Sequence, residues 1–461
     1  MLSQDRTTLL PLELFLKISH YLTYTDIRSC LLVNTHWHNA LSFPEITAPL
    51  ARRRRVNRNL DDARVVKLST IAAHANPVQA LKLRGNTFAT AAAATVATEQ
   101  NSGIEVRVWS LKTLKRVATF VVWMPMVIGL DFSEAADVLV VTVKGRLSPL
   151  RMVAYWLSDT SKDPEPLYKV EQQTTIRCLV VSARYVATID HVQNIMVRNV
   201  KDGKPVMTLA YDAPLTDPVI GIHLLPTHLL FATSTGLLRT TPLPTPTTSA
   251  THQLQTIHRI PTPTPTLFDT FVADGDLCLT LGPRAMAYYH LTLPTTTPPL
   301  HAPTARMTGT DSFHRTSGRL AHDIACIDAE TGRALVGETD PVDSVVWTRN
   351  VWIIAPPHAR RDETNIPVMR ELGWISPRMV ERRGGRFEID RADGTANLTT
   401  KPPLCVDRHL WADEAHKSVK RQLRATAAVG GVVRAAIGAE CVVMGMSSGK
   451  VVVALFDERE G

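Results

Sequence analysis

AHANPVQALKLRGNTFATAAAATVATEQNSGIEVRVWS, residues 73–110, is the stretch that decides the fold. Its apolar residues come in short runs at 78–83, 88–94 and 104–111, separated by Gly and Asn turn signals. In the last run, charged and apolar residues alternate, with Glu105 and Arg107 charged and Val106 and Val108 apolar. This alternation is typical of a strand with one buried face. The stretch therefore predicts three short strands joined by tight turns.

Runs of the same kind continue to residue 456, and few windows after residue 60 have the period of an amphipathic helix. The uncharged segment 117–130 is shorter than the ~20 residues of a membrane helix, and it contains Pro125 and Gly129. We interpret it as two buried strands around a turn. Further strands are predicted at 138–143, 152–157, 176–181, 185–189, 195–200, 229–233, 277–281, 334–336, 345–347, 441–444 and 451–456.

Residues 73–110 resemble a WD repeat, with His74 near the start and a Val-Trp-x ending at Trp109. Ala73 and Ser110 stand where the family usually has Gly and Asp. Residues 176–204 and 441–457 show a weaker similarity to the same repeat. The resemblance implies a β-propeller with seven blades, six or eight being the alternatives, closed by an N-terminal strand at 64–69 that joins the last blade.

The first forty residues have a different, helical pattern. Pro11 suits the first turn of a helix, and Leu14, Ile18 and Leu22 recur every four residues on one face. Thr25 or Asp26 can cap a second helix that carries Ile27, Cys30, Val33 and Trp37. This spacing resembles the F-box, a three-helix module that docks on the Skp adaptor of cullin-based ubiquitin ligases.

The resemblance implies a fold of a small three-helix F-box followed by a WD-repeat-like propeller, an α domain plus an all-β domain. We expect the F-box at residues 5–50, a basic linker at 51–64 and the propeller at 65–461, with an irregular insertion around 356–428. The Thr/Pro-rich stretches 240–248, 261–266 and 293–304 are expected to be loops. The residues expected to bind the adaptor are Leu10, Pro11, Leu14, Ile18, Leu22, Ile27, Cys30, Val33 and Trp37.

Four consecutive arginines, Arg52 to Arg55, interrupt the chain before the first strand. They fit a solvated linker kept extended by like-charge repulsion, and the alternatives are a nuclear localisation patch or a phosphate-binding strip. The formal net charge of +8 over 461 residues is mild. It does not by itself indicate nucleic acid, which we expect not to be a partner.

Six scattered cysteines without a CxxC pair fit a reducing compartment, and we expect the protein in the cytoplasm, the nucleus or both. Cys405, His409, Asp413 and His416 have metal-ligand atoms, but no second cysteine joins them, so no metal is expected. The sequence contains no nucleophile elbow, HExxH motif or Walker loop. No cofactor and no catalytic residue are therefore predicted.

The function implied by the resemblance is that of a substrate receptor. The F-box would bind the Skp adaptor and, through it, a cullin, while the propeller would hold a target protein, phosphorylated or not, for ubiquitination by proximity. The substrate site is left open. The alternative is a propeller that serves as a scaffold or a nucleic-acid-associated interaction module, with no role in a ubiquitin ligase.

Overall fold

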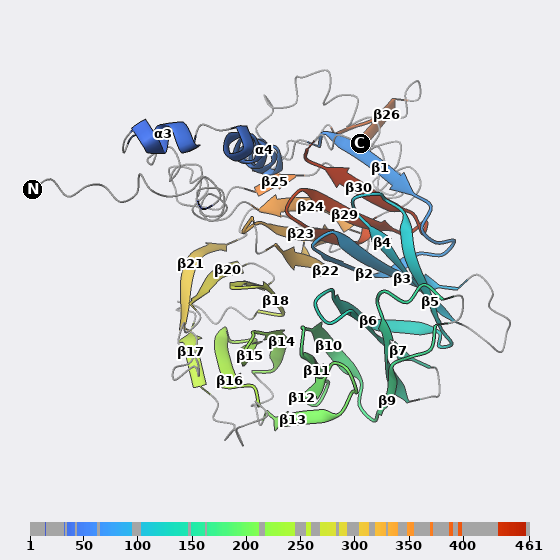
Figure 1. Ribbon diagram of the computed structural model, residues 1–461. Helices are drawn as coiled ribbons and strands as arrows, with labels where there is room; N and C mark the ends of the chain where they lie inside the picture. The colour runs from blue at the N-terminus through green and yellow to red at the C-terminus, as the bar shows by residue number, and fades with distance from the viewer. Residues whose placement is uncertain are drawn as a thin grey trace, which may run out of the picture.

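The computed structural model shows a ring of β-sheets with helices on its outer side (Figure 1). No helix among the residues it describes is long and apolar enough to span a membrane. The described residues are 14, 32, 35–41, 44–61, 65–94, 103–145, 149–161, 164–211, 217–244, 255–259, 268–282, 285–292, 304–312, 319–328, 331–339, 348–354, 369–371, 387–390, 395–398 and 432–457.

Five sheets of the ring have four antiparallel strands each, in the order of the sequence from the axis outward. The uncharged segment 117–130 is divided between the last strand of the first sheet and the first strand of the second, which confirms the two predicted strands. They are not buried throughout, because Val117, Val121 and Met126 are exposed. The strands of the five sheets are β2 (Val78–Arg84), β3 (Thr87–Ala93), β4 (Ile104–Ser110) and β5 (Arg116–Val122); β6 (Met126–Ser133), β7 (Val138–Lys144), β8 (Leu150–Trp156) and β9 (Tyr168–Gln172); β10 (Ile176–Val181), β11 (Tyr185–Asp190), β12 (Asn194–Asn199) and β13 (Pro205–Ala210); β14 (Val219–Leu224), β15 (His228–Thr233), β16 (Leu237–Pro242) and β17 (Gln255–Arg259); and β18 (Thr270–Asp274), β19 (Leu277–Leu281), β20 (Ala285–Thr292) and β21 (Thr304–Ser312).

The sixth sheet has eight strands because two groups of four are joined by one bridging pair, Thr348 with Val432. A separate two-stranded hairpin consists of β26 (Phe387–Asp390) and β27 (Thr395–Leu398). The strands of the eight-stranded sheet are β22 (Arg319–Ile327), β23 (Ala334–Thr339), β24 (Thr348–Ile354), β25 (Met369–Glu371), β28 (Val432–Ile437), β29 (Cys441–Met446), β30 (Val451–Leu455) and β1 (Lys67–Ile71).

The prediction of seven blades is wrong, because the described strands of the ring form six sheets. The sequence pattern distinguishes groups of strands, but it does not show that the pairing of β24 with β28 continues one sheet across two groups. The predicted strand at 345–347 lies outside the described residues, as does most of the insertion at 356–428. Of the Thr/Pro-rich stretches, residues 240–242 belong to strand β16 and residue 304 begins β21, so the expectation of loops is wrong there. Most of the rest lies outside the described residues.

The ring is closed by its first strand. β1 pairs antiparallel with β30, with Ser69 opposite Val453, which confirms the closing strand predicted at 64–69. Next to this pairing, the His74 N–H donates to the Gly449 carbonyl at 2.8 Å. Gly449 has φ +79°, and a Cβ there would collide with backbone carbonyls of the loop before β2. A glycine is therefore required where the last sheet meets the first.

A β-bulge near the start of the inner strand recurs in most of the sheets. The bulge leaves one residue of the strand without a partner and bends the strand, which suits a strand that lines a tight ring. The bulges lie at Val78/Ala80, Val127/Gly129, Ile176/Cys178, Val219/Gly221 and Val432/Arg434.

The core is distributed between neighbouring sheets. Between the first two sheets, Phe120, Phe132 and Tyr155 are buried, and the rings of Phe120 and Tyr155 lie 4.9 Å apart. Between the first and the last sheet, Phe88 and Trp109 pack with Val443 and neighbouring apolar residues of β29 and β30. Each sheet thus buries both faces against its neighbours, and the loops at the strand ends are held in fixed positions.

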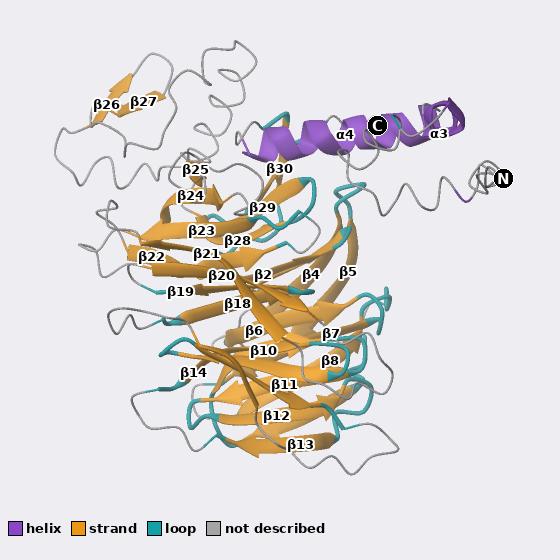
Figure 2. Ribbon diagram, turned by 90° about the vertical axis from the view of Figure 1, so that its left-hand side faces the viewer, coloured by secondary structure: helices purple, strands orange, loops and turns teal. Residues whose placement is uncertain are grey.

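Two helices are described before the ring, α3 (Thr35–Leu41) and α4 (Pro44–Asp61). α4 lies along the outer side of the eight-stranded sheet (Figure 2). Its side chains Val56 and Leu60 are buried in one cluster with Phe456, so this helix belongs to the core of the closing sheet.

The predicted fold class, with a three-helix F-box before the propeller, is therefore wrong: the described part of the chain is nearly all β, and no three-helix module is found in it. The expectation that Arg52 to Arg55 stay extended is wrong as well, since all four lie within α4.

Candidate functional site

The first unit of the ring contains a buried chain of polar contacts built from the WD-like residues. The Trp109 indole N–H donates to the Thr90 hydroxyl oxygen at 3.0 Å, and Nε2 of His74 lies 2.9 Å from the same oxygen. His74 is in the loop before β2, Thr90 on β3 and Trp109 on β4. The three residues tie that loop to two strands of its sheet.

Burial and the charge of Arg107 lower the pKa of His74 to about 4. The carboxylate of Glu105 lies 3.5 Å from Nδ1 of His74 and 2.8 Å from Nη2 of Arg107. Arg107 also donates to the carbonyl of Ala73. At neutral pH the imidazole is uncharged, and these contacts hold the fold together.

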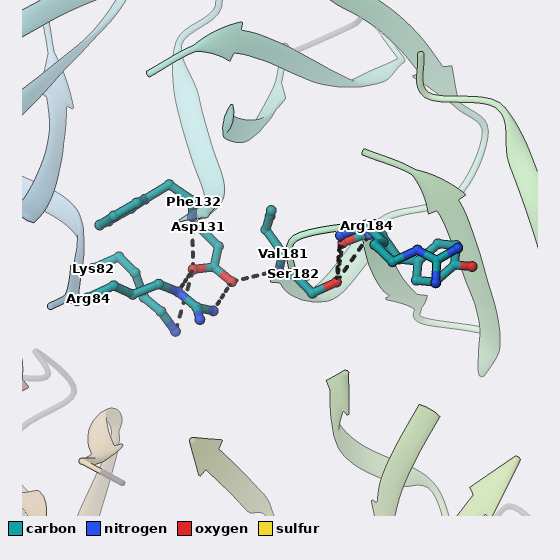
Figure 3. A network of polar contacts seen from close by, with 8 residues as sticks. Lys82, Arg84, Asp131, Phe132, Val181, Ser182 and Arg184 are labelled. Atoms are coloured by element: carbon teal, nitrogen blue, oxygen red, sulfur yellow. Dashed lines mark hydrogen bonds and ion pairs between the residues drawn. The ribbon is translucent and has the colours of Figure 1, made fainter. Parts of the chain in front are cut away.

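A second polar network surrounds Asp131, which lies near the C-terminal end of β6 (Figure 3). Its side chain is 1% exposed. Arg84 donates through Nε and Nη2 to its two oxygens at 3.1 and 2.9 Å. The N–H groups of Val181 and Phe132 donate at 2.8 and 2.9 Å. Lys82 Nζ lies 3.8 Å away. One carboxylate thus binds groups from β2, β6 and β10, the inner strands of three successive sheets.

Burial disfavours the charged form of Asp131, but the charges of Arg84 and Lys82 and the hydrogen bonds outweigh it, so the pKa of this carboxyl is lowered. The same contact raises the pKa of Arg84. Because both oxygens of Asp131 already accept hydrogen bonds, we assign the group a role in joining the sheets.

The chain turns directly after Val181, and this turn forms one wall of a cavity. The Ser182 hydroxyl donates to the Tyr185 carbonyl at 3.1 Å, and the Tyr185 hydroxyl donates to the carbonyl of Pro244 at 2.6 Å. The Arg184 guanidinium lies 5.5 Å from the centre of the Tyr185 ring. The cavity has a volume of about 450 Å³ and is lined by Ala183, Arg184, Tyr185, Asn199, Val200, Lys201, Val206 and Pro244.

Positive charge dominates this cavity. Arg184 and Lys201 are exposed, and the described lining includes no carboxylate. Tyr185, Val206 and Pro244 add an apolar surface. The Tyr185–Pro244 hydrogen bond connects the third sheet with the fourth, so the shape of the cavity is fixed by both. The arrangement suits an acidic, partly apolar segment of another molecule.

The arginines of α4 are partly used for docking the helix. Arg52 and Arg55 are hydrogen-bonded to Asp457, whose side chain is 1% exposed, and Arg52 also pairs with Glu440 at 3.0 Å. On the same helix, the Asn59 amide donates to the Phe456 carbonyl at 2.9 Å. Carboxylates from the turns that flank the last two strands, β29 and β30, thus offset the repulsion between the arginines.

Of the residues expected to bind an adaptor, Leu14 and Trp37 are described. Leu14 is helical and 41% exposed, and Trp37 is half-buried in α3. Leu10, Pro11, Ile18, Leu22, Ile27, Cys30 and Val33 lie outside the described residues. The four residues weighed as metal ligands, Cys405 to His416, also lie outside, and within the described ranges no group of three metal-ligating side chains is found.

Sequence reasoning missed Asp131 and the Arg184–Tyr185 turn. A signal for Asp131 was present, because a lone acidic residue in the apolar run Ile128 to Phe132 must find partners if the run is buried. No such signal marks Arg184, whose neighbours in space come from residues 199–206 and 244.

The comparisons with known proteins support the fold. No family model matches the sequence, and no curated protein is similar to it. The chain is similar in structure to the β-propeller domain of Cps50 (Swd1) from Myceliophteria thermophila, with a TM-score of 0.50 and 10% identity, covering 84% of this chain and 99% of that one. It also matches a chain of the mitotic checkpoint complex, with a TM-score of 0.46 and 9% identity, covering 86% and 97%. The fold is a WD-repeat-like β-propeller.

Proposed function

We propose that this chain is a β-propeller interaction scaffold that binds a protein partner and does no chemistry itself. The observation that carries the proposal is the cavity beside Tyr185, where Arg184 and Lys201 stand without a lining carboxylate. Cationic side chains beside an apolar wall favour an acidic segment. The network around Asp131 supports the proposal, because it keeps the neighbouring turn in place before a partner arrives.

A role as the adaptor subunit of a ubiquitin ligase has no support. The described residues contain no three-helix F-box, and the comparisons give no Skp or cullin partner. A nucleic-acid-associated role receives less support than protein binding. It would rest on the arginines of α4, and Arg52 and Arg55 are engaged by Asp457. A phosphate would have to compete with that carboxylate.

The test is a selection of peptide ligands from a random library displayed on phage, with the full chain as bait. We expect enriched peptides that combine Asp or Glu with apolar residues. Binding of those peptides should fall by about tenfold or more in the Arg184→Glu, Lys201→Glu variant, because the charge at the cavity is reversed. Lys169→Glu is the control, since Lys169 is also an exposed cation, on β9, and does not line the cavity. Equal loss in both variants, or enrichment without acidic residues, would contradict the proposal.

A further inference from the structure

β5 is the outermost strand of the first sheet, and its outer edge is unpaired among the described residues. It pairs with β4 alone, with Val121 opposite Glu105 and Thr119 opposite Arg107. The N–H and C=O groups that point away from β4 therefore have no partner strand. An edge of this kind is a template on which another extended chain can add.

The outer end of this sheet also presents an apolar surface. Val117 is 45% exposed and Val121 40%, and they are followed by Trp123 at 61%. We call these three residues the β5 stripe. The Trp123 ring lies against Gly103, where a Cβ would come within 3.3 Å of the ring, so the indole is held against the sheet. Exposed apolar side chains that cluster in this way mark interaction sites.

Two other outer strands, β9 and β13, carry charged residues or a proline on their edges. β9 exposes Lys169 and Glu171, and β13 begins at Pro205 and exposes Thr208. Charges and proline on an edge discourage the addition of a further strand. β5 has an exposed charge at its first residue, Arg116, but neither a charge nor a proline between residues 117 and 122, where its exposed positions include Val117 and Val121.

Three cations precede the β5 stripe. Lys112, Lys115 and Arg116 are exposed, and none of them has an ion-pair partner among the described residues. The segment 111–126 contains no Asp or Glu, so a second copy that paired through its own β5 would bring no carboxylate to these cations. Charge complementarity favours a different molecule with acidic residues at one end.

We propose that β5 binds an extended peptide segment of a partner protein by strand addition. The peptide would have apolar side chains at every second position, which lie against the β5 stripe, and carboxylates at the end beside Lys112, Lys115 and Arg116. Backbone hydrogen bonds to the edge would supply affinity, and the stripe and the cations would supply selectivity. The site is separate from the cavity of the proposed function and needs no side chain of its lining.

The probe is a fluorescein-labelled peptide of alternating Thr and Val that ends in three Glu residues, and fluorescence anisotropy with the full chain measures binding. We expect binding that weakens by about tenfold or more in Val121→Lys, because a charge is placed on the apolar stripe. A probe N-methylated at alternate residues on its pairing edge should bind at least as weakly, since it cannot donate to β5. Val192→Lys is the control, since Val192 is 52% exposed in the turn between β11 and β12 and does not line the cavity.

A charge exchange completes the test. The Lys115→Glu, Arg116→Glu variant should lose the probe that ends in Glu and bind one that ends in Lys, which also shows that the variant is folded. Val121→Lys is also tested in the Arg184→Glu, Lys201→Glu background, where the cavity no longer favours an acidic probe. The loss caused by Val121→Lys should persist there, so a failure of the cavity proposal is distinguishable from a failure here. The proposal is overturned if the N-methylated probe binds equally well. It is also overturned if sedimentation shows a dimer of the chain that Val121→Lys dissociates.

Discussion

The guanidinium of Arg52 is hydrogen-bonded to the carboxylate of Asp457, although 405 residues separate the two along the chain. Arg55 donates to the other oxygen of Asp457 at 3.0 Å. Burial opposes the charged form of Asp457, but the bonds from Arg52 and Arg55 outweigh this effect and lower the pKa of the carboxyl. The hydrogen bond to Asp457 in turn raises the pKa of Arg52. These bonds thus attach α4, the helix before the ring, to the turn that follows β30, the last strand of the chain.

Replacing Asp457 with Asn should loosen α4. The amide is uncharged and cannot accept from both arginines as a carboxylate does, so we expect a loss of about 1–3 kcal/mol in the free energy that holds the helix on the sheet. Amide hydrogen exchange of residues 44–61 measures this loss directly. Glu440→Gln is the control, because Glu440 is 32% exposed and should matter less. Exchange that stays as slow as in the unmodified chain would contradict the docking role of Asp457.

Asp131→Asn should destabilise the ring. The substitution removes the charge that Arg84 faces and turns an amide NH₂ toward one of the backbone N–H donors of Val181 and Phe132. Breaking a buried ion pair in this way costs about 3–5 kcal/mol, which equilibrium unfolding in urea can measure.

The exposed pair Arg151–Glu171 offers a matched control for the Asp131 variant. Its atoms lie 3.0 Å apart, close to the 2.9 Å between Arg84 and Asp131, but the two side chains are 42% and 63% exposed. Glu171→Gln should change the free energy of unfolding by less than about 1 kcal/mol, because solvent screens an exposed pair. If the Asp131 and Glu171 variants unfold at the same urea concentration, the role given to Asp131 is wrong.

Thr90→Val tests the polar chain in the first unit. Valine has nearly the shape of threonine but cannot accept from the Trp109 indole or contact Nε2 of His74. Two buried polar groups lose their partner, so we expect about 1–3 kcal/mol of destabilisation in thermal or urea unfolding. Thr113→Val, at an exposed turn position, should be neutral. A stable Thr90→Val variant would show that the chain of contacts contributes little.

Stability should fall as the pH drops from 6.5 to 4. The pKa of His74 and that of His223, whose imidazole donates to the Gly275 carbonyl, are each lowered to about 4 from an ordinary value of 6.5, chiefly by burial. In this window the unfolded chain binds protons that the folded chain does not, so the free energy of unfolding decreases with decreasing pH. Each histidine can account for at most about 3 kcal/mol.

The His74→Gln variant separates this histidine effect from the carboxyl groups. Its free energy of unfolding should decline less steeply between pH 6.5 and 5 than that of the unmodified chain. Asp131 and Asp457 affect stability at lower pH, because the pKa values of both carboxyl groups are lowered. Their contribution to the free energy of unfolding is lost only as the pH falls below about 4. Parallel curves for the two chains would rule out His74 as a source of the pH dependence.

Much of the propeller could be predicted from the sequence, because alternation of apolar residues reports local strand structure. The strands at 176–181 and 277–281 were predicted with the bounds that the structure shows. The closing strand was predicted as well, since an exposed last edge requires a partner. The number of sheets was not, because the pairing of Thr348 with Val432 depends on contacts between segments far apart in the sequence.

The N-terminal helices show a different limit. Apolar residues at intervals of four predict a helical face, but they do not determine what covers it. The arginines of α4 were expected to repel one another into an extended chain, and the carboxylates that offset the repulsion are supplied by Glu440 and Asp457. The cavity beside Tyr185 could not be predicted for the same reason, since its wall at Pro244 comes from another sheet. Local pattern carries no information about such distant partners.

The pairing of β1 with β30 sets an order of events during synthesis. A ribosome delivers residues 67–71 long before residues 451–455, so β1 has no partner strand while the sheets between them are made. Until β30 emerges, the face of the first sheet that holds Phe88 and Trp109 also lacks the cover it has in the finished ring. In the nascent chain this apolar face is therefore open to aggregation from the synthesis of β4 until that of β30. A chaperone that covers the face would be needed most while β30 is still missing.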